Sequence, residues 1–393
     1  TGNVNNGITH TAGNIANLTI NKGVNLGNSG ITNNAAIGNF TNNANITYSG
    51  SGSITGDFSN AKDSTITLNN NNNLILNGNG NAFSNNGTLK GTISNIGVLS
   101  SFTNTGSITG LESGNITGLL SNSNTGIIDN LVVNGNVSQM QNAGNITDVI
   151  IKSEITNGII NGDSNHKQAT IGKLDIQASL GSNGLQNAGT ITSLINNFSN
   201  TKLNNAGNIG SLDIQKNLNY SGSGSITNSI DIAQNKTLTA DYGITLNATN
   251  GSVNNEGILA GALTLKGSSN SVTNSGNITT IINNANNSNL TNNSNIGALA
   301  VNGNLTYKGN GSDRITQALV VAANKTLTIN GSGSNNGTLS FKSTNGTIKN
   351  AGTIAGNLSN VRDSTITSIT NSGIITGDLY NDGHIDTGRL FTS

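Results

Sequence analysis

The carboxylates that could take part in acid–base chemistry are thinly spread along this chain. Only 17 acidic residues occur among 393, and their closest groupings are Asp163 with His166 and Asp175, and Asp231 with Asp241. Cleavage of a glycosidic bond needs two carboxyl groups about 5–10 Å apart. Neither grouping repeats a catalytic pattern, and no nucleophile elbow, zinc-protease helix or phosphate-binding loop motif occurs. We therefore expect a protein that is not an enzyme, and keep a carbohydrate-active β-helix enzyme as the least favoured alternative.

The three histidines stand far apart in the sequence, at His10, His166 and His384. A zinc-type site needs several imidazole or carboxylate ligands in one small volume. Only His384 has close neighbours of that kind, Asp382 and Asp386. These three could be metal ligands, but the segment reads more simply as a polar cap on the end of the fold. We expect no metal and no cofactor.

Three tyrosines, Tyr48, Tyr220 and Tyr307, stand at equivalent places in segments that resemble one another. Each follows Asn-(Ile/Leu)-(Thr/Asn) and precedes a stretch rich in Ser and Gly. Aromatic rings at equivalent places could stack against sugars or another protein, which makes these tyrosines candidate surface contacts. The alternative is that each ring covers a wide turn formed by the Ser/Gly stretch.

A short motif, apolar-x-Asn-x-Gly-x-apolar, recurs along nearly the whole chain and determines where these side chains lie. Neighbouring copies are roughly 18 to 21 residues apart, which indicates a stacked repeat rather than a globule around one central core. Clear copies are Phe83/Asn85/Gly87/Leu89, Phe102/Asn104/Gly106/Ile108, Met140/Asn142/Gly144/Ile146, Leu185/Asn187/Gly189/Ile191, Leu203/Asn205/Gly207/Ile209, Val272/Asn274/Gly276/Ile278, Ile348/Asn350/Gly352/Ile354 and Ile369/Asn371/Gly373/Ile375.

Within one repeat the apolar residues alternate with polar ones, as in Ile209–Ile214, which is typical of short strands. Strands of four to five residues joined by tight corners complete one circuit in a repeat of about 19 residues, because a strand rises about 3.3 Å per residue. The sequence therefore predicts an all-β parallel β-helix, a solenoid of about 20 rungs of roughly 18–21 residues.

Each position of the motif then has a structural role. The apolar residues, such as Ile146, Ile191 and Ile278, would form columns that point into the interior. Glycines such as Gly144 would occupy a corner that needs a positive φ or a close backbone approach. The preceding asparagines, such as Asn142, tolerate the left-handed region and can bond to the next rung as an Asn ladder.

Composition excludes several other classes of protein. The chain has no Cys, so it forms neither disulfides nor thiolate metal sites. The 17 basic and 17 acidic residues give no net charge and no basic run, so we expect no nucleic-acid partner. No stretch approaches the ~18 apolar residues of a membrane span. We expect one continuous β-helix domain over residues 1–393, with 380–393 as a C-terminal cap, and interpret the chain as a piece of a longer secreted protein.

The recurring Asn-Ala-Gly-Asn-Ile and Asn-Ser-Gly-Asn-Ile units, with Ile and Leu columns and no Cys, resemble the passenger domains of Gram-negative autotransporters and filamentous-haemagglutinin-type adhesins. Within these families they look most like the Asn-rich repeats of vacuolating-cytotoxin-like autotransporters. The resemblance implies a right-handed β-helix, export to the bacterial cell surface, and a role in adhesion or host contact. It defines no functional residues.

These observations favour a non-enzymatic rod, secreted or on the bacterial cell surface, that acts as an adhesin stalk or passenger in attachment. Its partner would be a glycan or protein of the host surface. The alternative is a structural subunit that assembles end to end with copies of itself into an extracellular filament or sheath, because unpaired strand edges invite such pairing.

Overall fold

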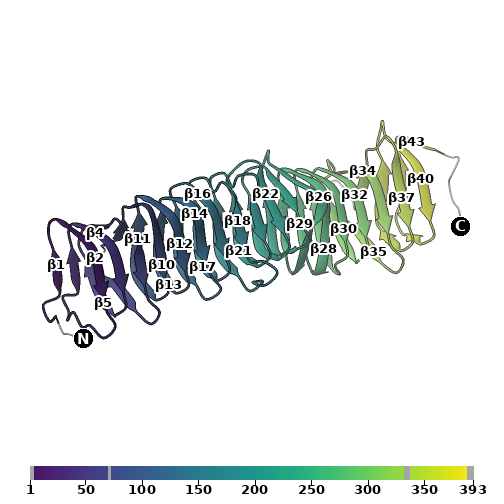
Figure 1. The fold of residues 1–393 in the computed structure, drawn as a ribbon. Coiled ribbons are helices and arrows are strands. Elements are labelled where there is room, and N and C mark those ends of the chain that lie inside the picture. The colour runs from purple at the N-terminus through teal and green to yellow at the C-terminus, as the bar shows by residue number, and fades with distance from the viewer. Residues whose placement is uncertain (1–3, 70–71, 332–336, 387–393) are drawn as a thin grey trace. The chain divides into compact units, whose positions relative to one another are not determined.

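A computed structural model describes residues 4–69, 72–331 and 337–386 of the chain. It confirms the predicted fold class: the chain is an all-β parallel β-solenoid of about 20 turns with about 19 residues per turn, and the described residues contain no helix. By its internal contacts the chain divides into two compact units, Thr1–Asn208 and Ile209–Ser393. Figure 1 shows successive strands of each unit stacked in parallel. The handedness of the coil stays a prediction.

The strands of the first unit are short, mostly three to eight residues long. They are β1 (Ile8–His10), β2 (Asn14–Ile20), β3 (Ile31–Asn33), β4 (Ala36–Asn42), β5 (Ile46–Ser49), β6 (Ser53–Ile54), β7 (Phe58–Asn60), β8 (Thr65–Leu68), β9 (Leu74–Leu76), β10 (Asn79–Asn85), β11 (Thr88–Asn95), β12 (Val98–Asn104), β13 (Ser107–Ser113), β14 (Asn115–Asn122), β15 (Ile127–Val133), β16 (Val137–Asn142), β17 (Asn145–Ile151), β18 (Ile159–Asn161), β19 (Thr170–Ile176), β20 (Leu185–Asn187), β21 (Thr190–Asn196) and β22 (Thr201–Asn205).

The strands of the second unit are similar, apart from the longer β26 and β28. They are β23 (Asn208–Ile214), which starts at the last residue of the first unit, β24 (Leu218–Ser221), β25 (Ser225–Ile232), β26 (Thr237–Thr249), β27 (Ser252–Asn255), β28 (Ile258–Ser268), β29 (Ser271–Asn274), β30 (Asn277–Asn283), β31 (Ser288–Asn292), β32 (Asn295–Val301), β33 (Leu305–Gly309), β34 (Arg314–Val321), β35 (Thr326–Asn330), β36 (Thr338–Phe341), β37 (Gly346–Asn350), β38 (Thr353–Ala355), β39 (Asn357–Asn360), β40 (Thr365–Asn371), β41 (Ile374–Ile375), β42 (Leu379–Asn381) and β43 (His384–Ile385).

The parallel register places like residues above like residues, as the motif predicts. In the first unit β4, β7, β10, β12, β14 and β16 pair in this order, so that Phe40, Phe58, Phe83, Phe102, Leu120 and Met140 form one column. The rings of Phe83 and Phe102 are stacked with centroids 4.3 Å apart. All six side chains are buried, so the column forms part of a dry core.

The Asn-x-Gly step of the motif is the corner between two strands. Strand β16 ends at Asn142 and β17 begins at Asn145, so that Ala143 and Gly144 make the turn. The side chains of Asn142 and of Ile146 beyond the corner are both buried. The motif therefore carries the chain from one wall of the solenoid to the next with an amide inside the bend.

The corner glycines are required for close approach and not for a left-handed backbone. Gly144, Gly189, Gly207 and Gly276 are absent from the residues of positive φ. A Cβ at Gly207 would instead overlap the carbonyl oxygen of Gly189 on the preceding rung. Of the two reasons that the sequence allowed for glycine, close backbone approach is correct.

The left-handed conformation expected of the ladder asparagines is wrong, because these residues end extended strands. Positive φ occurs in tight turns elsewhere, at Asp63, Asn235, Asn324 and Asp363 among others. In each of these four turns the next residue donates its N–H to the carbonyl of the residue three positions earlier. The same residue type thus serves two backbone conformations, which composition alone does not separate.

The described part of the expected C-terminal cap continues the solenoid. In the second unit β42 pairs with β39, and β43 pairs with β40, both in parallel. Residues 387–393 of the expected cap lie outside the described residues. A single continuous domain over 1–393 stays a prediction.

Candidate functional site

Asparagines at successive strand ends, those of the motif among them, form a continuous hydrogen-bonded ladder from Asn42 to Asn205 in the first unit. Each side-chain Nδ2 donates to Oδ1 of the next asparagine over 2.7–2.9 Å. The members are Asn42, Asn60, Asn85, Asn104, Asn122, Asn142, Asn161, Asn187 and Asn205. All are buried, which confirms the predicted Asn ladder and assigns these repeat positions to the fold.

Ladder amides also donate to backbone carbonyls at the corners of their own rung or of the next one. The Nδ2 of Asn142 donates to Oδ1 of Asn161 at 2.8 Å, to the carbonyl of Gly144 at 3.3 Å, and to the carbonyl of Thr170 on the next rung at 3.0 Å. The carbonyl of Gly144 also accepts from the N–H of Thr170, so the asparagine amide supplies a second donor to a buried carbonyl oxygen that has two lone pairs. The asparagine therefore links the corner to the next rung through several hydrogen bonds.

A tyrosine ends the ladder in the second unit. Asn255 donates to Asn274 and Asn274 to Asn292, and Asn292 then donates to the hydroxyl of Tyr307 at 3.2 Å. On this rung Gly309 stands at the ladder position, opposite Asn292. The carboxylate of Asp313 occupies the space that a Cβ at Gly309 would enter, and Tyr307 donates its hydroxyl to that carboxylate. Burial raises the pKa of Tyr307, and the negative charge of Asp313 raises it further.

Tyr48 has the same place in the first unit. It lies opposite Ile31 in the apolar column, and its hydroxyl accepts a hydrogen bond of 2.9 Å from Nδ2 of Asn33. Asn33 also bonds to Nδ1 of His10 at 2.8 Å. Burial raises the pKa of Tyr48 to about 12, although the bond from Asn33 opposes this shift. The hydroxyl thus replaces an asparagine amide on a rung that lacks one.

The predicted surface contact through these tyrosines is wrong. Tyr48 and Tyr307 are 0% exposed, and Tyr220 is 4% exposed and donates its hydroxyl to the carbonyl of Gly224. Gly224 belongs to the Ser/Gly stretch that follows Tyr220, so this ring does support that turn. The tyrosines recur because the fold needs them, and no ring face is open to a ligand.

The fold brings together only part of the grouping of Asp163, His166 and Asp175 that the sequence predicts. In the first unit Asp163 bonds to His166, but Asp175 bonds instead to Gln177 and Asn197. Within the described ranges no three His, Asp or Glu side chains group so that they could hold a metal ion, which goes against a ligand set of Asp382, His384 and Asp386.

In the second unit Asp231 lies beside Asp213 and Glu256 rather than beside Asp241. These three side chains line a shallow groove of about 470 Å³. Burial raises the pKa of Asp231, and the negative charge of Asp213 adds to this rise. Asp213 precedes Asp231 by one repeat, a spacing that could have identified the pair in the sequence.

An insertion in the first unit builds a groove at the side of the stack. The ladder step from Asn161 to Asn187 spans 26 residues, whereas the steps on either side span 19 and 18. Between β18 and β19 the segment Gly162–Ala169, here called the 162–169 loop, protrudes from the corner. Its ends stay in register, because the N–H of Gly162 bonds to the carbonyl of Asn142 and that of Thr170 to the carbonyl of Gly144.

The 162–169 loop is held by one carboxylate. Oδ1 of Asp163 accepts hydrogen bonds from the N–H of Asn165 at 2.7 Å, from the N–H of His166 at 2.9 Å and from Nδ1 of His166 at 2.9 Å. These donors, the N–H of Asn165 foremost, hold the pKa of Asp163 below its usual range. Because an ionised carboxylate only accepts, Nδ1 of His166 carries a proton. Oδ2 of Asp163 and Nε2 of His166 make no hydrogen bond within the described part of the chain.

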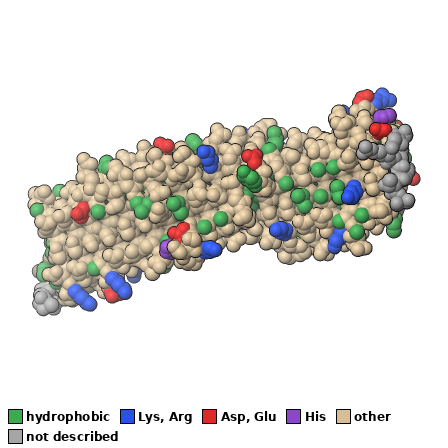
Figure 2. Space-filling model, turned by 45° about the vertical axis from the view of Figure 1, so that its right-hand side comes forward, with side chains coloured by type: hydrophobic (Ala, Val, Ile, Leu, Met, Phe, Trp, Pro, Cys, Tyr) green, Lys and Arg blue, Asp and Glu red, His purple; other side chains and the backbone are tan. Residues whose placement is uncertain are grey.

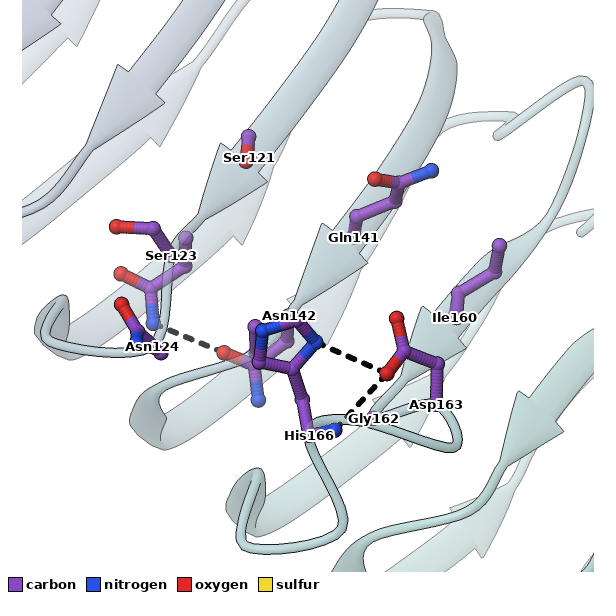
Figure 3. A pocket seen from close by; sticks show the side chains of 11 residues that line it. Ser121, Ser123, Asn124, Gln141, Asn142, Ile160, Gly162, Asp163 and His166 are labelled. Atoms are coloured by element: carbon purple, nitrogen blue, oxygen red, sulfur yellow. Dashed lines mark hydrogen bonds and ion pairs between the residues drawn. The ribbon is translucent and has the colours of Figure 1, made fainter.

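The groove lies between this loop and the two preceding corners, and has a volume of about 370 Å³. Figure 3 shows His166 and Asp163 on one side of it, with Ser123 and Asn124 of the earlier corner on the other. Its wall is a row of outward side chains from paired strands, in order along the stack Ser121, Gln141 and Ile160. The groove was missed in the sequence because most of its polar groups belong to ordinary repeats, and only the long Asn161–Asn187 spacing signals it.

Apart from this groove and the acidic groove of Asp213, Asp231 and Glu256, charged side chains are dispersed on the face that Figure 2 draws. Figure 2 shows acidic and basic side chains as scattered spots on a surface of mostly uncharged atoms. His166 and Asp163 form an ion pair when the imidazole is protonated. No described helix is both long and apolar enough to cross a membrane.

Comparison of the chain with models of protein families, with curated proteins and with solved structures finds no match in any of the three.

Proposed function

We propose that this chain is a non-enzymatic rod, secreted or on the bacterial cell surface, that serves as an adhesin stalk or passenger in attachment. One observation carries the proposal: the residues that recur in the repeat are used in stacking. The asparagines bond along the ladder, the glycines allow neighbouring corners to approach, and the aliphatic residues fill the core. Each further repeat adds one rung to the stack, and added rungs lengthen the solenoid and enlarge its lateral surface.

The test is attachment by the chain itself. Beads coated with the purified chain should attach to cultured host cells in larger numbers than beads coated with an unrelated protein of zero net charge. Coating with the chain after denaturation supplies a second control, because adhesion through the folded lateral surface needs the stack. Equal attachment of all three coatings would contradict an adhesive role.

The competing filament role makes a different prediction for the purified chain. Electron microscopy should show discrete particles if the chain is a stalk or passenger. End-to-end fibres that lengthen with protein concentration would instead support a subunit that pairs with copies of itself.

Catalysis is tested with a panel of polysaccharides. We expect no depolymerisation by the chain. Release of reducing ends that is lost on replacing Asp163 or Asp175 by Asn would overturn the non-enzymatic part of the proposal.

A further inference from the structure

We propose that the groove beside the 162–169 loop is a binding site for an uncharged, linear oligosaccharide. This inference rests on the proposed adhesive function and assigns to it one place and one class of ligand. The argument starts from what the groove offers: hydroxyl, amide, carboxylate and imidazole groups converge on a volume of about 370 Å³, within the range of ligand sites in proteins.

The polar atoms that face the groove match the hydroxyls of a sugar. Oδ2 of Asp163 is an acceptor, and Nε2 of His166 accepts in the neutral ring or donates in the charged one. Oδ1 of Asp163 is fully used in holding the loop, so the carboxylate is oriented before a ligand arrives. Such preorganisation lowers the ordering cost of binding.

The wall of the groove is periodic in the direction of the stack. Ser121, Gln141 and Ile160 are register partners on three successive rungs, separated by about 4.8 Å. The Nε2 of Gln141 donates to Oε1 of Gln139, which fixes the orientation of the Gln141 amide. The Oε1 of Gln141 is then left to accept a hydrogen bond from a ligand. One sugar unit of a linear glycan advances by a similar distance, so successive units meet successive rungs. The exposed face of Ile160 gives a small apolar contact for a sugar ring.

The lining selects an uncharged glycan over an anionic one and over a peptide. It contains the carboxylate of Asp163 and no Lys or Arg, so an acidic sugar would meet a like charge. A peptide added as a strand needs unpaired backbone groups, whereas Ser121, Gln141 and Ile160 lie on strands paired on both sides. Side-chain hydroxyls and amides are what remain for recognition.

Binding of the full chain to an array of defined glycans, both uncharged and sialylated, tests the inference. We expect uncharged linear oligosaccharides to bind and their sialylated forms to bind at least tenfold more weakly. Titration calorimetry with the strongest binder should then show at least a tenfold loss of affinity for His166→Gln and for Gln141→Leu. Gln141 lies on β16 and not on the loop, so its variant tests the groove even if the loop of the His166 variant rearranges. Asp148→Asn, an acidic position of the same unit outside the groove, should bind as wild type.

Absence of any glycan binding, equal affinity of all variants, or preference for sialylated glycans would overturn the inference. So would a host protein without glycans that competes for the groove. The cell-attachment assay separates the inferred glycan site from the proposed adhesive function on which it rests. Attachment that persists at wild-type level in His166→Gln and Gln141→Leu leaves the adhesin role standing and removes this site. Loss of attachment in these variants, with Asp148→Asn unaffected, supports both.

Discussion

At the scale of the residue, the ladder asparagine is the side chain on which each corner depends. Asn122 accepts from Asn104 and donates to Asn142, and it also holds the carbonyls of Gly126 and Asn145. These bonds connect three rungs through one buried amide.

Replacing Asn122 by Ala should lower the free energy of unfolding by at least about 2 kcal/mol, because it leaves the buried Oδ1 of Asn142 without its ladder donor and the Nδ2 of Asn104 without its ladder acceptor. The exposed neighbour Asn124 is the matched control, and its change to Ala should stay within about 0.5 kcal/mol. Urea unfolding followed by circular dichroism measures both. Equal midpoints would mean that the ladder does not stabilise the stack.

The corner glycine makes a second prediction. Gly207→Val should destabilise the protein by about 1–3 kcal/mol or more, because the new side chain collides with the backbone of Ala188 and Gly189. Ser211→Val places the same side chain at a half-buried strand position and should cost much less. Melting temperatures of the two variants decide the matter, and indistinguishable values would refute the close-approach role of the glycine.

The buried tyrosine makes the fold sensitive to alkali. Tyr48 ionises near pH 10 when unfolded and near pH 12 when folded, so its contribution is complete below pH 10 and is lost as the pH rises towards about 12. A shift of this size corresponds to about 2–3 kcal/mol. Tyr307, with its pKa raised in the same direction, acts likewise in the second unit.

Stability measured from pH 9 to 12 should therefore fall less steeply in Tyr48→Phe than in wild type. The variant is less stable at neutral pH, because Asn33 loses the hydroxyl that accepts its hydrogen bond. Tyr242→Phe changes a ring that is 90% exposed and should keep the wild-type slope. An unchanged slope in Tyr48→Phe would contradict the burial of its hydroxyl.

What the sequence reveals about single residues depends on how often they recur. The sequence assigns Asn142 and Gly144 to a corner because many rungs repeat them, and stacking is the simplest cause of such repetition. Tyr48, Tyr220 and Tyr307 recur less often, so the same argument did not place them inside. Their inward direction follows from the two-residue alternation, which sets Tyr48 in the column of Ile31, and from the glycine that replaces asparagine two positions later.

At the scale of the element, the 162–169 loop is an addition to a corner that is complete without it. Deleting Asp163–Gln168 leaves Asn161-Gly162-Ala169-Thr170, the same length as the corner Asn187-Ala188-Gly189-Thr190. The deletion should keep the strand content and change the melting temperature by only a few degrees, because the removed residues are mostly exposed.

Circular dichroism of the deletion variant measures both the strand content and the melting temperature. Loss of the β spectrum would show that the loop is part of the stack. Retention of the spectrum together with loss of glycan binding would match a functional insertion on a rigid scaffold.

The elements themselves were the most predictable part of the structure, because alternation and repeat length both constrain them. The conformation of the corner that connects β18 to β19 was not predicted. A loop such as Gly162–Ala169 has no periodicity of its own, and its conformation depends on where the Asp163 carboxylate finds donors. Likewise Asp213 and Asp231 are distant in the sequence and become neighbours only once the rung length is fixed.

At the scale of the whole molecule, neutral contacts carry the fold. Amide ladders, aliphatic columns and backbone pairing recur on rung after rung, while the pair of His166 with Asp163 lies on a surface loop outside the stack. Raising the salt concentration screens charges and leaves these contacts intact.

The melting temperature should therefore change by less than about 2 °C between low and physiological ionic strength. A protein held by surface charge networks would shift more. Differential scanning calorimetry at matched pH makes the comparison, and a large loss of stability with salt would point to charge contacts as a main source of stability.

The fold of the whole chain was predictable from the sequence because like residues recur at one spacing, whereas its biological role was not. Asn142 and Ile146 would be required in any protein that stacks such rungs. Recognition depends on side chains such as Gln141 and His166, which point outward and are free to vary without disturbing the core.

The ladder of the first unit has a direction. Every Nδ2 donates towards the C-terminal neighbour, so the side-chain amides are aligned head to tail and polarise one another. Their carbonyl stretching vibrations should couple along the row instead of absorbing independently. Infrared spectra of protein labelled with ¹³C at the asparagine side chains should show a band displaced from that of solvated amides, and the displacement should shrink when Asn122→Ala cuts the row in two.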